Sequence, residues 1–248
     1  MRYALFFLLF GFCSIALNAQ IGEQALEKMH RTYAGKWSNT LTFVQRTENY
    51  TNDSLTKVST WYETIAYPDQ FRIDFGDPAE GNAVLFLGDT VFSFRKGSLA
   101  KKSQHFNDLI FLLGGMYFQP LEKVKTTMRT LEFDLSKGYK TTWKGKAVYV
   151  IGAAPGDENA NQLWIDKKRL VLLRMIRTKN GQREEAIFEN HIRTGKAWTE
   201  TKITFYIGGK LFQVEYYDQV KTNVPIKEGH FDPEQFGKVN HWEGVGKG

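Results

Sequence analysis

The sequence predicts a mainly β protein with helical insertions, whose curved antiparallel sheet of about eleven strands forms an incomplete barrel closed by a helical lid. Short segments rich in Val, Ile, Thr, Phe and Tyr recur along most of the chain. The turns between them are short, so neighbouring strands are expected to be antiparallel. Because exposed sheet edges invite aggregation, we expect the sheet to curve and two helices to plug its mouth.

The strand series follows a short amphipathic helix, expected over residues 22–33 because Ala25, Leu26 and Met29 recur at helical spacing. A polar loop is expected over residues 48–54, and Gly88-Asp89 fits a tight hairpin turn. The strands expected in this half of the chain are 41–47, 58–67, 71–75, 83–87 and 91–94.

The middle of the chain changes character, because residues 107–131 predict two short helices instead of strands. Residues 106–113 are apolar on nearly all sides and end at Gly114-Gly115, a typical helix stop. Leu121, Val124 and Met128 then recur at helical spacing. Strands are expected again over 139–143, 146–151, 162–166, 170–178, 184–193, 197–207 and 211–221.

The first residues predict a cleaved secretory signal peptide over 1–19. Arg2 precedes an apolar run over 3–12, and Ala19 ends a small-residue cleavage site. The run is too short for a membrane-spanning helix, which disfavours the alternative of an uncleaved anchor. Phe12 before Cys13 argues against lipoprotein processing, so we expect no lipid anchor. The expected organisation is this signal peptide, one domain over 20–236 and a tail over 237–248.

Motifs of catalysis are not found in the sequence. Cys13 is the only cysteine, and the five histidines, at positions 30, 105, 191, 230 and 241, include no helical i, i+4 pair. We therefore expect no enzyme, no metal and no cofactor; the alternative is an exported enzyme whose site is assembled from residues distant in the sequence. The acidic pairs 157–158 and 184–185 are interpreted as solvated surface charge. The net charge of +6 is scattered, which excludes a focused nucleic-acid surface and gives weak support for an anionic membrane surface.

Apolar side chains share faces of several expected strands, for example Phe71, Ile73 and Phe75. Two interpretations remain open. The pattern alone favours an ordinary filled core, because protein interiors are close-packed. The alternative is a curved sheet too wide for its own side chains, which leaves an apolar hollow for a lipid.

Three short motifs resemble the LolA/LolB-like family of periplasmic proteins. Phe43-x-Gln45 resembles the first-strand Phe-x-Gln, Pro68-x-x-Phe71 the Arg-Pro-x-x-Phe element, and residues 88–94 the Asp-Gly-x-Thr-Leu-Trp-x-Tyr hairpin. The family has an eleven-stranded incomplete barrel with a helical lid, and its type members carry outer-membrane lipoproteins. Tyr67 stands where the family has the arginine that latches the lid, and Leu87 replaces an Asp.

This resemblance implies a monomeric periplasmic carrier of the LolA type, which holds acyl chains of lipoproteins or lipids and passes them toward the outer membrane. Its expected partners are an inner-membrane loading complex and an outer-membrane acceptor, with no nucleic acid. The alternative is a sensor or assembly module of the same fold that binds a protein or peptide. The resemblance implies a lid contact at Tyr67 and an apolar cavity lined by Phe43, Ile65, Phe71, Ile73, Phe75, Phe92, Phe94, Ile110, Leu113, Ile203 and Phe205.

Overall fold

The computed structural model describes residues 21–179 and 181–238, so the predicted signal peptide and most of the predicted tail lie outside the described residues. The chain divides into two compact units, each built from two segments. The first unit comprises Met1–Thr32 and Leu121–Glu185, and the second comprises Tyr33–Pro120 and Ala186–Gly248. The single domain expected over residues 20–236 stays a prediction.

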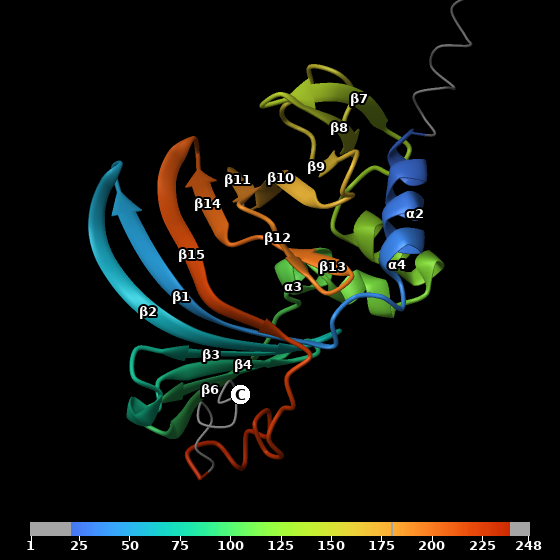
Figure 1. The fold of residues 1–248 in the computed structure, drawn as a ribbon. Helices are drawn as coiled ribbons and strands as arrows, with labels where there is room; N and C mark the ends of the chain where they lie inside the picture. The colour runs from blue at the N-terminus through green and yellow to red at the C-terminus, as the bar shows by residue number, and fades with distance from the viewer. Residues whose placement is uncertain (1–20, 180, 239–248) are drawn as a thin grey trace, which may run out of the picture. The chain divides into compact units, whose positions relative to one another are not determined.

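The first unit contains two helices and an antiparallel meander in which each strand pairs with the next, in the order β11-β10-β9-β8-β7. The chain passes from the first unit to the second within β11. Figure 1 labels the elements, whose bounds are α2 (Ile21–Tyr33), α4 (Leu121–Thr130), β7 (Gly138–Trp143), β8 (Lys146–Ile151), β9 (Gln162–Asp166), β10 (Leu172–Lys179) and β11 (Gln182–Glu189).

The two helices of the first unit confirm the helical spacing of the sequence. Ala25, Leu26 and Met29 form the buried face of α2, and its acidic and basic residues follow the helix dipole. Lys125 of α4 forms ion pairs of 2.7 Å with Glu23 and 2.8 Å with Glu27 of α2. The two helices are therefore linked by ion pairs of one lysine with two glutamates.

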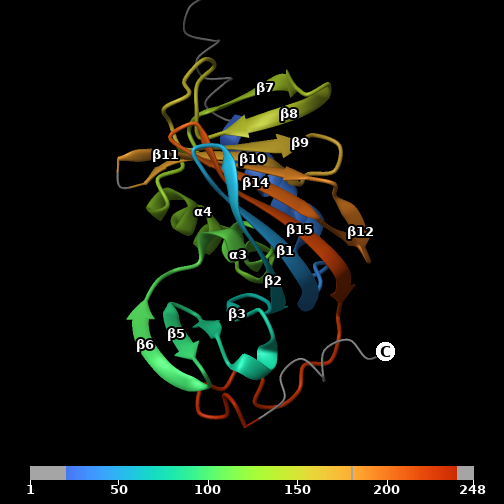
Figure 2. The same ribbon diagram turned by 90° about the vertical axis from the view of Figure 1, so that its left-hand side faces the viewer.

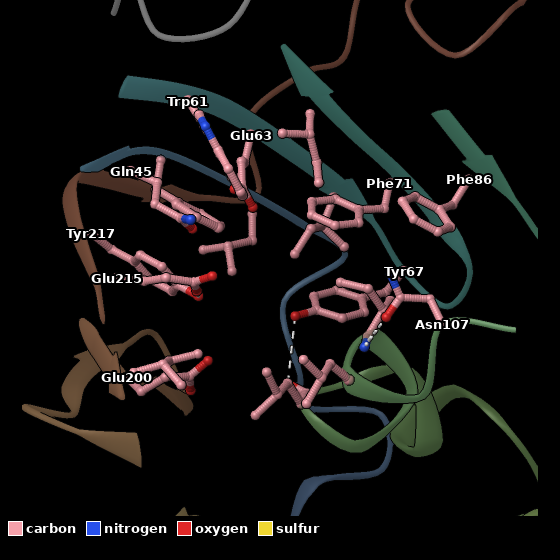
Figure 3. Close-up of a pocket in the computed structure, with 18 of the residues that line it drawn as sticks. Gln45, Trp61, Glu63, Tyr67, Phe71, Phe86, Asn107, Glu200, Glu215 and Tyr217 are labelled. Atoms are coloured by element: carbon pink, nitrogen blue, oxygen red, sulfur yellow. Dashed lines mark hydrogen bonds between the residues drawn. The ribbon is translucent and has the colours of Figure 1, made fainter. Parts of the chain in front are cut away.

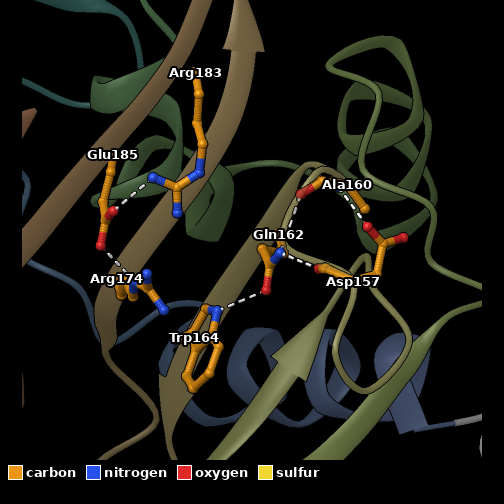
Figure 4. A network of polar contacts seen from close by, with 7 residues as sticks. All are labelled: Asp157, Ala160, Gln162, Trp164, Arg174, Arg183 and Glu185. Carbon is orange, nitrogen blue, oxygen red and sulfur yellow. Dashed lines mark hydrogen bonds and ion pairs between the residues drawn. The ribbon is translucent and has the colours of Figure 1, made fainter. Parts of the chain in front are cut away.

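A network of polar contacts closes the loop between β8 and β9 (Figure 4). Gln162 donates to the carbonyl of Asp157 at 2.8 Å and accepts a hydrogen bond of 2.9 Å from the indole of Trp164. The carboxylate of Asp157 accepts from two backbone amides inside the loop. Glu185 forms an ion pair of 2.6 Å with Arg174 on the neighbouring strand. The acidic pairs interpreted as solvated charge thus include loop-capping and cross-strand groups.

The second unit holds a larger antiparallel sheet in the order β6-β5-β4-β3-β2-β1-β15-β14, and a separate hairpin of β12 and β13. Figures 1 and 2 show β1, β2 and β15 as long curved strands. The bounds are β1 (Thr40–Thr51), β2 (Ser54–Ala66), β3 (Gln70–Phe75), η1 (Pro78–Glu80), β4 (Ala83–Leu87), β5 (Thr90–Arg95), β6 (Ser98–Gln104), α3 (Asp108–Leu112), η2 (Gly115–Phe118), β12 (Ile192–Thr194), β13 (Ala197–Thr199), β14 (Lys202–Ile207) and β15 (Lys210–Thr222).

The helix α3 ends just before the predicted break at Gly114-Gly115, and the 3-10 turn η2 begins at Gly115. The side chain of Asn107 caps α3 by accepting from the amide of Ile110 at 3.1 Å. A Cβ at Gly114 would lie 2.4 Å from the ring of Tyr67 and 2.5 Å from the indole nitrogen of Trp37. A glycine is required at this position because two aromatic rings occupy the space of a side chain.

One face of β3, β4 and β5 packs against the C-terminal segment of the same unit. Phe94 stacks on Phe236 with ring centroids 3.8 Å apart. Arg72 and Asp74 form a fully buried ion pair with hydrogen bonds of 2.6 and 2.7 Å, and Arg72 also donates to the carbonyl of His230 at 3.1 Å. This face is therefore a second core.

The predicted fold class is confirmed, since the chain is mainly β with a large antiparallel sheet and a few helices. Several boundaries differ. The expected polar loop over 48–54 is wrong, because β1 and β2 continue to a turn at Asn52-Asp53 with positive φ angles. The exposed strand β6 was not predicted, because its side chains are almost all polar.

The described residues form fifteen strands, more than the about eleven expected. The expected strand over 184–193 is divided into β11 and β12, with Asn190 between them at φ 53°. The expected strand over 197–207 is divided into β13 and β14, and Glu200 lies between them. Polar residues at these breaks interrupt the hydrogen-bonding ladder where the apolar pattern runs on.

Candidate ligand-binding cavity

The second unit contains a partly open cavity of about 210 Å³. Its walls come from β1, β2, β3, β4, β14 and β15, and residues of α3 and the turn after it complete the lining. Eight of the predicted cavity residues and the predicted lid contact Tyr67 line it: Phe43, Ile65, Phe71, Ile73, Ile110, Leu113, Ile203 and Phe205. That any of them binds a ligand stays a prediction.

Strand alternation explains why these side chains meet. Cavity residues are alternate positions on each strand, such as Leu41 and Phe43 on β1 or Phe71 and Ile73 on β3. Phe71 pairs with Phe86 across β3 and β4, and their rings stack with centroids 5.6 Å apart. Directly paired residues share a face of the sheet, so the pairing register brings the rows of different strands onto one surface.

Three residues expected in the cavity lie elsewhere, namely Phe75, Phe92 and Phe94. Phe75 shares the cavity face but packs edge-on against Trp61, with ring centroids 5.0 Å apart. Phe92 pairs with Leu85, the neighbour of the cavity residue Phe86, so it faces the other way. Phe94 belongs to the second core with Phe236.

Tyr67 lies between the sheet and the turn after α3, as Figure 3 shows. Its hydroxyl donates a long hydrogen bond of 3.4 Å to the carbonyl of Leu113. Its ring stacks on Phe118 with centroids 5.7 Å apart, and its side chain also forms a hydrogen bond with Trp37. Burial raises the pKa of the Tyr67 hydroxyl, so it remains a neutral donor.

Polar side chains that the sequence reasoning missed also line the cavity: Gln45, Asn107, Glu63, Glu200, Glu215 and Tyr217. Alternation was the signal that would have found two of them. Gln45 is two residues from Phe43, and Glu63 is two residues from Ile65, so each shares the face of a predicted cavity residue. Both residues are polar, so a prediction based on apolar side chains alone does not include them.

The three glutamates are almost fully buried, with 4% exposure for Glu63 and 8% for both Glu200 and Glu215. Desolvation raises the pKa of Glu63 well above its ordinary value, and the charge of Glu215 adds to the effect. Desolvation also raises the pKa of Glu200 to about 8 and that of Glu215 to about 7. Hydrogen bonds from Tyr217, Gln213 and Gln45 oppose the shift at Glu215.

The cavity is therefore divided in character (Figure 3). Phe71 and Phe86 lie at one side, whereas Glu200, Glu215 and Tyr217 lie at the other. Such a cavity can hold an apolar chain by contact and a polar group by hydrogen bonds, without a covalent step. Within residues 21–179 and 181–238, no cluster of three His, Cys, Asp or Glu side chains is suited to hold a metal ion.

A second hollow lies in the first unit and differs in chemistry. It is lined by Lys28, Arg31, Lys140 and Tyr149 among others, and has a volume of about 410 Å³. Lys28 lies over the ring of Tyr149, with its nitrogen 5.8 Å from the centroid. Lys28 and Arg31 are exposed, so this hollow is a basic surface depression rather than an apolar cavity.

The large antiparallel sheet and the few helices define a LolA-like fold, as the sequence motifs predicted. The chain is similar to a DUF1329 family protein from Desulfovibrio piger ATCC 29098, with 13% identity, a TM-score of 0.62 and coverage of 88% of this chain and 99% of that one. A putative outer membrane lipoprotein-sorting protein domain from Vibrio parahaemolyticus gives 12% identity, a TM-score of 0.58 and coverage of 89% and 100%.

A LolA superfamily protein from Nitrosomonas europaea gives 13% identity, a TM-score of 0.52 and coverage of 85% of this chain and 96% of that one. No model of a known protein family matches the sequence, and no curated protein matches it. At these identities the likeness shows the fold alone. None of the helices among the described residues has the length and apolar character needed to span a membrane.

Proposed function

We propose that this protein is an exported, periplasmic carrier that binds acyl chains of lipoproteins or lipids in the cavity of its second unit and delivers them toward the outer membrane. The observation that carries the proposal is the partly open, largely apolar cavity of about 210 Å³, lined by α3 and six strands. A filled interior was the alternative favoured by the sequence pattern. The likeness to a lipoprotein-sorting domain and a LolA superfamily protein supports the same role.

The size of the cavity suits weak, reversible binding. Each buried methylene contributes about 0.8 kcal/mol, so eight of them give about 6 kcal/mol before the cost of ordering the chain. Association itself costs at least about 4 kcal/mol, so a short buried segment leaves a low net affinity. Low net affinity is what a carrier needs in order to hand its cargo to an acceptor.

The contact between Tyr67 and Leu113 is proposed as the closing contact of the lid. A single hydrogen bond of 3.4 Å between neutral groups replaces the arginine contacts that the family resemblance implies. Such a bond contributes about 1 kcal/mol, so the hydrogen bond itself opposes movement of Leu113 away from Tyr67 only weakly. The cavity is expected to admit a chain by this movement.

A cavity-filling pair of variants tests the proposal. Ile203 lines the cavity and is 1% exposed, whereas Ile192 is 42% exposed and lies outside it. With a fluorescent fatty acid as probe, Ile203→Trp should weaken binding at least tenfold, and Ile192→Trp should change it less than twofold. Leu113→Trp fills the cavity from the α3 side and should act like Ile203→Trp.

Thermal unfolding of each variant shows whether it is folded. Equal probe binding by Ile203→Trp, Leu113→Trp and the wild type would contradict the proposal, as would a gently extracted protein whose mass spectrum shows no bound lipid or lipoprotein. Recovery of one defined protein without lipid would favour the sensor or assembly module instead.

A further inference from the structure

We propose that the cargo carries a protonated amine next to its apolar chain, and that Glu63, Glu200 and Glu215 bind this amine at the polar side of the cavity. The inference rests on the proposed function, because it names the polar group of the ligand that the same cavity holds.

The three carboxyl groups reach the cavity from separate parts of the second unit. Glu63 lies on β2, Glu200 follows β13, and Glu215 lies on β15. In Figure 3, Glu200 and Glu215 lie on the opposite side of the cavity from Phe86. Residues far apart in the sequence thus bring three acids into one cavity, with Glu200 and Glu215 away from Phe86 and Glu63 close enough to Glu215 to feel its charge.

Two of these acids are buried without a side-chain partner among the described residues. Glu215 accepts hydrogen bonds of 2.9 Å from the hydroxyl of Tyr217 and 2.5 Å from the amide of Gln213. Only its own backbone amide donates to the carboxyl of Glu200, and no hydrogen bond contributes at Glu63. Buried polar groups are nearly always hydrogen-bonded, so side chains left open toward a cavity point to a ligand.

A cation suits this wall better than any other polar group. Among the residues that line the cavity there is no Lys, Arg or His, so positive charge must come with the ligand. Ionised carboxylates only accept hydrogen bonds, and an ammonium group has three N–H donors and no acceptor. A phosphate or carboxylate headgroup would instead be repelled by Glu215, whose pKa of about 7 leaves it partly ionised at neutral pH, and would oppose ionisation of the other two acids.

The protonation states of Glu200 and Glu215 predict that binding of an amine releases protons, which can be measured. Because burial raises the pKa of Glu200 to about 8 and that of Glu215 to about 7, Glu200 is mostly protonated and Glu215 partly protonated in the empty cavity near neutral pH. The other titratable groups that face these acids in the cavity are the hydroxyls of Tyr67 and Tyr217, which stay neutral. Binding of an ammonium favours the ionised carboxylates, so protons are released as the ligand enters.

Three eight-carbon ligands test the inference by calorimetry on the full chain at pH 7.5: octylamine, octanol and octanoate. We expect octylamine to bind at least tenfold more tightly than octanol, and octanoate more weakly than both. Titration in two buffers of different ionisation enthalpy should show proton release with octylamine and none with octanol.

The double variant Glu63→Gln/Glu200→Gln should lose at least tenfold in octylamine affinity and keep octanol affinity within twofold, which also shows that its cavity is folded. Glu228→Gln is the matched control, because Glu228 is exposed and does not line the cavity. If octanol binds as tightly as octylamine, or if the double variant binds octylamine like the wild type, the inference is overturned and the carrier proposal stands. If none of the three ligands binds, both are overturned.

Discussion

The buried pair of Arg72 and Asp74 offers the sharpest test of how the second unit is held together. The two side chains are 1% and 2% exposed and are joined by two hydrogen bonds. Arg72 also donates to the carbonyl of His230 and lies over the ring of Phe236, 4.7 Å from its centroid. The substitution Asp74→Ala removes both charge-assisted hydrogen bonds and leaves the guanidinium buried.

The cost follows from the contacts. Each charge-assisted hydrogen bond contributes about 1.5–3 kcal/mol, and removing one partner of a buried ion pair typically costs about 3–5 kcal/mol. We therefore expect Asp74→Ala to lower the free energy of unfolding by about 4 kcal/mol. For a chain of this size the melting temperature should fall by about 8–16 °C.

Urea unfolding followed by tryptophan fluorescence measures this loss. Glu189→Ala is the control, because its ion pair with Lys202 in the same unit is 3.3 Å long and partly exposed, and it should cost at most about 1 kcal/mol. The double substitution Arg72→Met/Asp74→Leu removes the whole pair and should recover at least half of the loss. An Asp74→Ala loss below about 1 kcal/mol, or a double variant less stable than the single one, would refute the reasoning.

Three further predictions concern other parts of the chain. Burial raises the pKa of Glu200 from 4.5 to about 8, so its contribution to stability is full below pH 4.5 and is lost as the pH rises toward 8. A pKa shift of this size corresponds to about 5 kcal/mol. In urea unfolding, Glu200→Gln should therefore flatten the fall in stability between about pH 5 and 9, and an unchanged fall would contradict the shift. Gly114→Ala should cost about 1–3 kcal/mol by urea unfolding, since its Cβ meets the ring of Tyr67, and wild-type stability would contradict the packing. Lys125→Met should cost at most about 1 kcal/mol, because Glu122 is exposed and Glu23 and Glu27 are partly exposed. The melting temperature should therefore fall slightly in low salt and hardly at all in 0.5 M salt, and an equal loss in both salts would show a buried pair instead.

The strand and helix pattern could be predicted because each element depends on its own residues. Period-two segments such as β3 and helical spacing such as that of α2 and α4 are local properties. Errors occurred where local composition and tertiary pairing disagree. The polar strand β6 forms because it pairs with β5, and the polar ends of β1 and β2 form because they pair with each other.

Only part of the cavity lining could be predicted from the sequence, because the lining also depends on how the strands pair. Alternation places Phe71 and Ile73 on one face, but it does not say which face of each strand looks into the cavity. The register between β3, β4 and β5 decides this, and it turns Phe92 away from the cavity. Register depends on turns and pairing partners, which the sequence pattern of a single strand does not contain.

The buried acids give the strongest reason to treat the cavity as a site rather than a packing defect. A cavity left by imperfect packing would be lined by apolar groups, because desolvating a carboxyl group destabilises the fold unless a partner compensates. Here the wall holds Glu63, Glu200 and Glu215, and the raised pKa of Glu200 and of Glu215 means that burial opposes their ionised forms. Groups that destabilise the empty protein and become satisfied only when a donor enters are typical of functional sites. We therefore propose that the apolar wall supplies affinity for a chain and that the acidic groups decide which chains are accepted.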